Sequence, residues 1–270
     1  MFRKIISKTR ENILIKYFKF IYPNSSYYFV NNLYEKKIDL LTYSQHMQDV
    51  VVSKYIFNKK KEGYFVDVGC NHPINLNNTY LLELNGWKGL AIDPLKEFNE
   101  IWSAKRTTEK LDLFISDKVE ELTFYQIENQ EEDWESMLST ANLTNELKKY
   151  NPTEITVKTQ TLKDIFISKN IRKVDALFID VENYDYEVLK GIDFKLVDIN
   201  LIIIENVRHR FRNFDIGSKN IRNHLKNRGF QFLFRINGDD YFQQSNYLKD
   251  VNLQELYKHI ESSKFIKKIN

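Results

Sequence analysis

The fold can be predicted from residues 64–71, which have the sequence YFVDVGCN. They begin as an apolar run of strand length and then meet an acid and a glycine, Asp67 and Gly69. A second apolar run, LAID at residues 90–93, ends in Asp93. In a parallel α/β sheet, strands end this way beside an adenosine-type ligand, because glycine lets the backbone approach closely and a carboxylate can accept from both ribose hydroxyls. We therefore expect such a ligand at the carboxyl ends of two parallel strands.

The sequence around these two runs alternates between β-rich and helical patterns. Strands are expected at residues 64–68, 89–92, 111–115, 174–179 and 201–204, and helices at residues 78–84, 95–104, 162–168 and 186–190. This alternation indicates βαβ units and a parallel sheet. Residues 230–236, a turn at 237–240 and a returning strand from Tyr241 predict an antiparallel hairpin. We expect a Rossmann-like α/β fold with a mostly parallel seven-stranded sheet, this C-terminal hairpin, and helices on both faces.

Three segments are expected along the chain. Residues 1–43 form an N-terminal helical extension, residues 44–248 the main domain, and residues 249–270 a basic helical tail. The first 20 residues have the pattern of a basic amphipathic helix, which either packs on the domain or contacts an anionic membrane surface or a partner. Residues 120–157 interrupt the alternation, and we interpret them as an insertion over the strand ends, where substrate loops usually lie.

Composition narrows the class of protein. The 270 residues are 42% hydrophobic, which is enough for a sizeable core. The 40 basic and 37 acidic residues leave a net charge of +3, so the charge gives no sign of nucleic-acid binding. The single cysteine excludes an intramolecular disulfide. No apolar run is long enough to span a membrane, and the N-terminus lacks the apolar core of a signal peptide, so we expect a cytoplasmic protein.

The loop after the first strand discriminates between adenosine ligands. A dinucleotide site has the spacing Gly-x-Gly-x-x-Gly, with a helix N-terminus at the pyrophosphate. Here Asn71 and Ile74 stand at the second and third glycine positions, and Pro73 delays the helix. The phosphate-binding spacing Gly-x-x-x-x-Gly-Lys-Ser/Thr does not occur in the chain. S-adenosylmethionine carries no phosphate, so this loop suits it better.

Several motifs, in order, resemble the FkbM family of class I methyltransferases, which depend on S-adenosylmethionine. They are SQHMQD at 44–49, FVDVGCNHP at 65–73, NNTY at 77–80, GWKG at 86–89, IDP at 92–94, ISD at 115–117, TQTL at 159–162, DALFIDVE at 175–182 and YEVLKG at 186–191. The resemblance spans about residues 44–245. Two positions depart from the family pattern: Asn183 replaces a usual glycine, and Cys70 replaces a small residue such as alanine.

The resemblance implies roles for residues at the ends of four strands. Cofactor-binding residues are expected at Asp67, Gly69, Asn71, Asp93, Ser116, Asp117 and Asp180. Asp93 would face the ribose, and Ser116 and Asp117 would lie near the adenine, whose amino group needs an acceptor. Glu182 is expected to act as the general base for the acceptor hydroxyl. Asp180 would hold the ammonium of the cofactor or position the acceptor.

These assignments have structural alternatives. Asp93 would also cap the helix that Pro94 opens, because Asp followed by Pro suits a helix start. Asp117 would serve as a residue of a plain hairpin turn before Lys118. Asp180 and Glu182, two residues apart, would form a solvated strand end.

Two histidines and a third acid complete the candidate site. His72 and His209 are secondary candidates for the base, although lone histidines are more often structural. Asp180, Glu182 and Glu205 could together form an oxygen-ligand cation site that acidifies a bound hydroxyl. No metal-binding spacing and no histidine cluster supports such a site, so no metal is expected.

The function implied by the resemblance is S-adenosylmethionine-dependent O-methylation of a small-molecule or carbohydrate acceptor. A sugar hydroxyl in polysaccharide or glycoconjugate biosynthesis is the leading choice. Two alternatives stay open. One is an NAD-dependent oxidoreductase on a similar sheet, which Asn71 and Ile74 disfavour. The other is a binding module that kept the fold and lost catalysis, which Asn183 keeps open.

Overall fold

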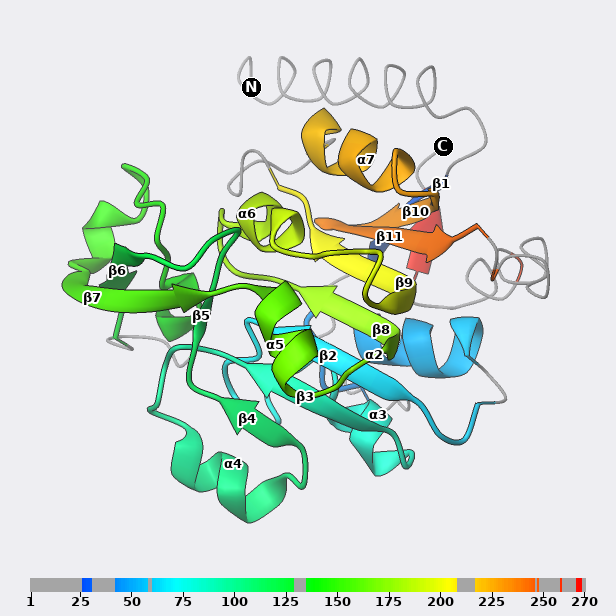
Figure 1. Cartoon of the computed structure of the whole chain (residues 1–270), viewed down its shortest axis with the longest axis horizontal. Helices are drawn as coiled ribbons and strands as arrows, with labels where there is room; N and C mark the ends of the chain where they lie inside the picture. Colours follow the sequence, from blue (N-terminus) through cyan, green and yellow to red (C-terminus); the bar gives the residue numbers. More distant parts are fainter. Residues whose placement is uncertain are drawn as a thin grey trace, which may run out of the picture. The chain divides into compact units, whose positions relative to one another are not determined.

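The computed structural model of the chain describes residues 42–57, 60–128, 135–207, 217–245, 247 and 258, and the backbone of 26–30 and 266–268 (Figure 1). The chain divides into two compact units: residues 40–205, and residues 1–39 together with 206–270. The expected N-terminal amphipathic helix, His209 and most of the expected helical tail lie outside the described residues. The division into segments 1–43, 44–248 and 249–270 stays a prediction.

The unit of residues 40–205 contains five parallel strands, visible in Figure 1. They lie in the order β9, β8, β2, β3, β4, with the bounds Asp198–Glu205, Lys173–Ile179, Tyr64–Val68, Lys88–Ile92 and Glu109–Leu111. Buried apolar residues dominate β2, as expected for a strand with neighbours on both sides. Val68 of β2 lies beside Ile92 of β3 and Ile179 of β8. The residues that follow these three strands are therefore neighbours at the carboxyl edge of the sheet.

Helices connect the strands of this unit. They are α3 Tyr80–Leu84, α4 Asn99–Lys105, α5 Leu162–Ser168 and α6 Asp185–Lys190, and an α-helical turn α2, Gln48–Val50, that continues as a π-helix η2, Val51–Ile56. In the view of Figure 1, α5 lies in front of the sheet. It begins where expected, because the Thr161 side chain caps it by accepting from Asp164 N. Helices α3 and α4 begin later than expected, because residues 78–79 and 95–98 belong to loops.

Residues 111–115, expected as one strand, divide between two sheets. The main sheet keeps β4 up to Leu111, whereas β5, Phe114–Ile115, pairs with β7, Thr153–Gln160, in a sheet completed by β6, Glu121–Gln126. The break falls at Asp112, whose carboxylate accepts from Lys110 Nζ at 2.7 Å and from Asn99 Nδ2 at 2.8 Å. Leu113 N donates to Leu111 O at 3.0 Å, which closes a tight turn, so the expectation of one continuous strand was wrong. The insertion between β6 and β7 contains two short 3-10 helices, η3 Glu135–Leu138 and η4 Lys148–Tyr150.

In the other unit, β10, Phe230–Ile236, and β11, Asp239–Gln244, form the expected antiparallel hairpin. The returning strand begins two residues earlier than expected, because two residues alone make the turn. Strand β1, Ser26–Val30, runs parallel to β10, and β12, Ile266–Lys268, runs antiparallel to β1. Strand β12 lies within the segment expected as a helical tail. Helix α7, Lys219–Lys226, begins after the capping residue Ser218.

The α/β class and the Rossmann-like arrangement are confirmed. The five parallel strands of the first unit and the two strands of the hairpin are the seven strands expected, with helices between them. Within the described part of the chain, no helix is both long and apolar enough to cross a membrane.

Candidate active site

The loop that follows β2, residues 69–79, is named here the β2 loop. It begins at Gly69, whose φ of 88° lies in the left-handed region. A Cβ atom at Gly69 would lie 1.8 Å from the backbone oxygen of Asp180, which follows β8. Gly69 N also donates to Ile92 O of β3 at 2.9 Å. Glycine at this position therefore lets the ends of three neighbouring strands meet. The role that the sequence predicts for Gly69, a close approach of the backbone to a ligand, stays a prediction.

Asp93, which follows β3, holds the β2 loop in place. One of its carboxylate oxygens accepts from Asn71 N at 2.9 Å, and the other accepts from Leu95 N at 2.8 Å. The residue is buried, and burial raises the pKa of its carboxyl, an effect that the two backbone hydrogen bonds oppose. Each carboxylate oxygen has a second lone pair. Asp93 can therefore shape the two loops and still accept a hydrogen bond from a ligand hydroxyl.

Asn71 carries the acceptor that best fits a ligand in this loop. Its backbone is left-handed, with a φ of 41°. Its Oδ1 atom is buried and has no hydrogen-bond partner within the part of the chain that the structure describes. A buried acceptor without a partner costs about 1–3 kcal/mol. An ammonium or hydroxyl group of a ligand would remove that penalty.

Asp67 lies within β2 and anchors the far end of the β2 loop. Its Oδ2 atom accepts from the Thr79 hydroxyl at 2.8 Å, and the residue is 1% exposed. Burial raises the pKa of the Asp67 carboxyl to about 6, although the Thr79 hydrogen bond and the nearby Arg106 charge lower it. In this structure Asp67 contacts the protein, and its expected contact with the cofactor stays a prediction.

Sequence analysis missed two residues that shape this loop. Asn77 lies inside the β2 loop with 1% of its surface exposed, and Arg106 follows α4 with 6% exposed. Arg106 donates to Asn77 Oδ1 and to Pro73 O, at 3.1 and 2.8 Å. The motif NNTY marked the segment that holds Asn77, but its role depends on the folded loop. No sequence signal marks Arg106, because it lies outside every motif that carries the resemblance.

Ser116 and Asp117 follow β5 and therefore lie at the end of a strand of the three-stranded sheet. The Ser116 hydroxyl lies 3.3 Å from Asp117 Oδ1 and 3.3 Å from the Tyr184 hydroxyl. Asp117 also accepts from Lys190 Nζ of α6 at 2.8 Å, and this bond lowers the pKa of the Asp117 carboxyl. Ser116 and Asp117 thus contact Tyr184, which precedes α6, and Lys190 of α6. Their expected place near an adenine stays a prediction.

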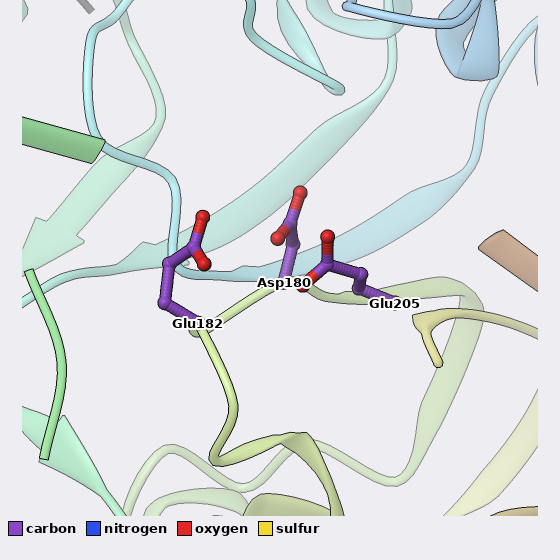
Figure 2. Close-up of side chains that lie close together, drawn as sticks. All are labelled: Asp180, Glu182 and Glu205. Carbon is purple, nitrogen blue, oxygen red and sulfur yellow. The ribbon is translucent and has the colours of Figure 1, made fainter. Parts of the chain in front are cut away.

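Three carboxylates come together at the ends of β8 and β9 (Figure 2). Asp180 and Glu182 lie in the turn that follows β8, residues 180–183, which is named here the β8 turn, and Glu205 ends β9. One oxygen from each of the three lies within 4.8 Å of one from each of the others. Figure 2 shows the three side chains converging from two neighbouring strand ends. The structure therefore brings together the acids that the sequence suggests as base, cofactor ligand and alternative cation site.

The backbone of the β8 turn is in an uncommon conformation. Glu182 and Asn183 have φ values of 52° and 66°, in the left-handed region that favours glycine. Asparagine tolerates this region better than most residues, which explains how Asn183 replaces the glycine usual in the family pattern. The Thr140 hydroxyl, from the insertion, donates to Glu182 O at 2.5 Å. The insertion therefore supports the turn that carries the expected base.

A fourth carboxyl group, that of Asp185, lies beside the β8 turn. Asp185 at the start of α6 is buried and accepts from Val181 N at 3.1 Å. Burial, together with the charges of Glu205 and Glu182, raises the pKa of Asp185 well above its ordinary value. Such a group of carboxyls attracts a cation, either an ammonium or sulfonium of an organic ligand or a metal ion that prefers oxygen ligands.

Of the two histidine candidates, the structure describes His72. Its Nδ1 atom accepts from Ile74 N at 3.0 Å and from Asn75 N at 2.8 Å, so this nitrogen is unprotonated. Burial lowers the pKa of His72. The imidazole thus forms a turn inside the β2 loop, and its base role stays a secondary prediction. His209 lies outside the described residues.

Comparison with known proteins identifies the family. The family model described as the methyltransferase FkbM domain matches residues 67–232, which run from Asp67 in β2 into β10. No curated protein and no solved structure matches the chain. The matched region covers more than half of the chain and includes the β2 loop, the insertion and the β8 turn. The chain therefore belongs to the FkbM methyltransferase family.

Proposed function

We propose that this protein transfers a methyl group from S-adenosylmethionine to a hydroxyl oxygen, and that the acceptor is a sugar in polysaccharide or glycoconjugate biosynthesis. The observation that carries the proposal is the convergence of Asp180, Glu182 and Glu205 within 4.8 Å beside the β2 loop. A positively charged methyl donor suits this negative site, because opposite charges attract strongly where water is partly excluded. The family supports methyl transfer in general, and the sugar acceptor follows from the family resemblance.

The residues of the β2 loop fit the neutral part of the same ligand. Asn71 Oδ1 is a buried acceptor without a partner among the described residues, and it lies in the residue whose backbone Asp93 holds. Asp93 would accept from the ribose hydroxyls, and Asn71 Oδ1 would accept from a further donor of the ligand. Asp180 would face the ammonium group. These are the residues that we propose hold the cofactor.

Glu182 would supply the proton acceptor of the reaction. When bound, S-adenosylmethionine supplies a methyl group on a positively charged sulfur that is open to in-line attack. A hydroxyl group is hardly ionised near neutral pH, so a base that takes its proton as the oxygen attacks accelerates the reaction. The Glu182 carboxylate would take this proton and release it to solvent afterwards. Glu205 would orient the acceptor hydroxyl toward the methyl group.

Calorimetry can test the choice of cofactor without knowledge of the acceptor. The purified protein is titrated with S-adenosylmethionine, with its demethylated product S-adenosylhomocysteine, and with NAD. We expect the first two to bind and NAD to bind far more weakly, because the β2 loop lacks the glycines of a pyrophosphate site. Preference for NAD would overturn the proposal and favour an oxidoreductase.

The acceptor can be sought in cells with and without the gene. Mass spectrometry of their glycans should show a difference of about 14 Da for each methyl group transferred. Identical glycans in both cells, with the change found in another class of metabolite, would reject the sugar acceptor and leave methyl transfer intact. Binding of S-adenosylmethionine without methylation of any acceptor in a broad panel would favour a binding module that has lost catalysis.

A further inference from the structure

We propose that Asn77 is a positioning residue that shapes the β2 loop for the cofactor. The inference rests on the proposed function, because it concerns binding of S-adenosylmethionine by this loop. Asn77 is 1% exposed, so its side chain acts on the ligand through the loop and not by contact. Its role follows from the direction of the hydrogen bonds that its amide makes.

The amide nitrogen of Asn77 holds the start of the β2 loop. Asn77 Nδ2 donates to Cys70 O at 3.1 Å and to His72 O at 3.0 Å. These two carbonyls flank Asn71, whose own N–H donates to Asp93 Oδ2 at 2.9 Å. The residue between them is therefore fixed from two sides, by an amide on one and a carboxylate on the other. This arrangement holds Asn71 in its left-handed conformation and sets the direction of its buried Oδ1.

The amide oxygen of Asn77 holds the end of the same loop. Asn77 Oδ1 accepts from Thr79 N at 2.9 Å and from Tyr80 N at 2.8 Å. Tyr80 is the first residue of α3, so these bonds satisfy N–H groups at the start of that helix. One side chain thus links the two ends of a loop whose backbone has no regular structure.

Arg106 supports Asn77 from outside the loop. Its guanidinium donates to Asn77 Oδ1 at 3.1 Å, to Pro73 O at 2.8 Å and to the Thr79 hydroxyl at 3.3 Å. The Arg106 side chain is fully buried and also pairs with Glu83 of α3. The ring of Trp102 lies 4.6 Å from the guanidinium carbon, within the range of a cation–π contact. A planar cation with several fixed donors is suited to bracing three acceptors at once.

The substitution Asn77→Asp separates the two functions of this side chain. A carboxylate of the same size can still accept from Thr79, Tyr80 and Arg106, but it cannot donate to Cys70 O and His72 O. The positive charge of Arg106 favours a carboxylate at this position, so the end of the loop should stay in place. The start of the loop, which carries Asn71, loses both bonds and faces a repulsive oxygen.

The test is calorimetric titration of the full-length wild type and Asn77→Asp with S-adenosylhomocysteine, alongside thermal unfolding. We expect a folded variant that binds roughly 10- to 100-fold more weakly, the range for losing one or two hydrogen bonds at a buried site. The matched control is Asn200→Asp. Asn200 is also buried, and its amide donates to Asp175 Oδ1 at 3.0 Å. Residue 200 lies near the start of β9, whereas the β2 loop lies beyond the carboxyl ends of the strands.

The control should lose stability but keep its affinity for S-adenosylhomocysteine. Equal affinity of wild type and folded Asn77→Asp would overturn the inference and leave the proposed function standing. Wild type that fails to bind S-adenosylhomocysteine would overturn the proposed function itself. If Asn77→Asp does not fold, Arg106→Lys replaces it, since lysine keeps the charge beside Glu83 but cannot span three acceptors. Affinity of folded Arg106→Lys equal to that of wild type would likewise reject the inference, and several-fold weaker binding would support it.

Discussion

The β2 loop and the β8 turn follow adjacent parallel strands, yet their side chains are arranged in opposite ways. In the β2 loop, polar groups bond to one another: Asp93 accepts from Asn71 N, and Asn77 links both ends of the loop. In the β8 turn, like charges gather, with Asp180, Glu182 and Glu205 within 4.8 Å. The first arrangement fixes a shape, and the second concentrates negative charge.

We infer from this difference that the β2 loop serves cofactor binding and the β8 turn serves catalysis. A loop whose hydrogen bonds are already made loses little freedom when a rigid ligand arrives, which favours affinity. Clustered carboxylates and left-handed residues such as Glu182 are costly arrangements that are found at functional sites. We therefore expect substitutions in the β2 loop to change cofactor affinity, and substitutions in the β8 turn to change turnover.

The largest expected effect is that of Glu182→Gln. This substitution keeps the size of the side chain and removes the proton acceptor. A general base typically contributes roughly 10²–10⁴-fold to rate, so kcat should fall by that factor while affinity for S-adenosylmethionine stays near that of wild type. Steady-state kinetics with the identified acceptor, together with calorimetry, measure the two quantities.

A chelator provides the control for Glu182→Gln. If the three carboxylates hold a metal ion, EDTA should abolish wild-type activity and Mg²⁺ should restore it. Chelator-insensitive wild type combined with an impaired Glu182→Gln supports the base role. Full activity of the variant would remove Glu182 from the mechanism and turn attention to Asp180.

A smaller effect is expected from Asp93→Ala, which affects the β2 loop. The variant loses the acceptor for the ribose and also the bonds to Asn71 N and Leu95 N. S-adenosylmethionine binding should weaken by roughly 1.5–3 kcal/mol, the range for hydrogen bonds to a charged group. At saturating cofactor, kcat should change little. Asp93→Asn keeps one acceptor oxygen and should fall between wild type and Asp93→Ala. A folded Asp93→Ala with wild-type affinity would move the ribose site elsewhere.

Buried Asp67 predicts a dependence of stability on pH. The pKa of its carboxyl is raised from 3.8 to about 6, so the native state binds this proton more tightly than the unfolded chain. The stabilising contribution is therefore complete below about pH 4 and is lost as the pH rises through about 6, with a change on the order of 3 kcal/mol. Asp67→Asn removes this titration. Urea unfolding at pH 5 and pH 7.5 should show the variant gaining stability relative to wild type at the higher pH, and a pH-independent difference would contradict the assignment.

Local sequence patterns predicted correctly the bounds of those strands and helices that have a turn or capping residue at one end. The expected ranges 64–68, 162–168 and 230–236 coincide with β2, α5 and β10. Each is followed or preceded by a residue that ends regular structure, such as Gly69 or the capping Thr161. The acids Asp93, Asp180 and Glu182 were predicted at strand ends because parallel strands place their carboxyl ends at one edge.

Contacts between distant segments could not be predicted in the same way. Arg106 bonds to Asn77 across 29 residues, and Thr140 bonds to Glu182 across 42 residues. Such pairs depend on how the loops pack, and no single sequence records that packing. The division of residues 111–115 between two sheets has a similar origin, since Phe114 and Ile115 pair with the distant residues Thr159 and Gln160 of β7.

The smallest expected effect tests whether the insertion acts on the β8 turn. Thr140 is fully buried, and its hydroxyl donates to Glu182 O and accepts from Asn142 N at 2.9 Å. Thr140→Val keeps the shape and removes both bonds, so the free energy of unfolding should fall by about 2 kcal/mol, since each hydrogen bond usually contributes about 1 kcal/mol. Because Glu182 would lose support for its left-handed backbone, turnover should also fall a few-fold, with unchanged affinity for S-adenosylmethionine. Thr140→Ser retains the hydroxyl and should keep wild-type turnover. If Thr140→Val instead weakens cofactor binding and leaves turnover intact, the division between a binding loop and a catalytic turn is wrong, since a residue whose hydroxyl supports the β8 turn would then control affinity.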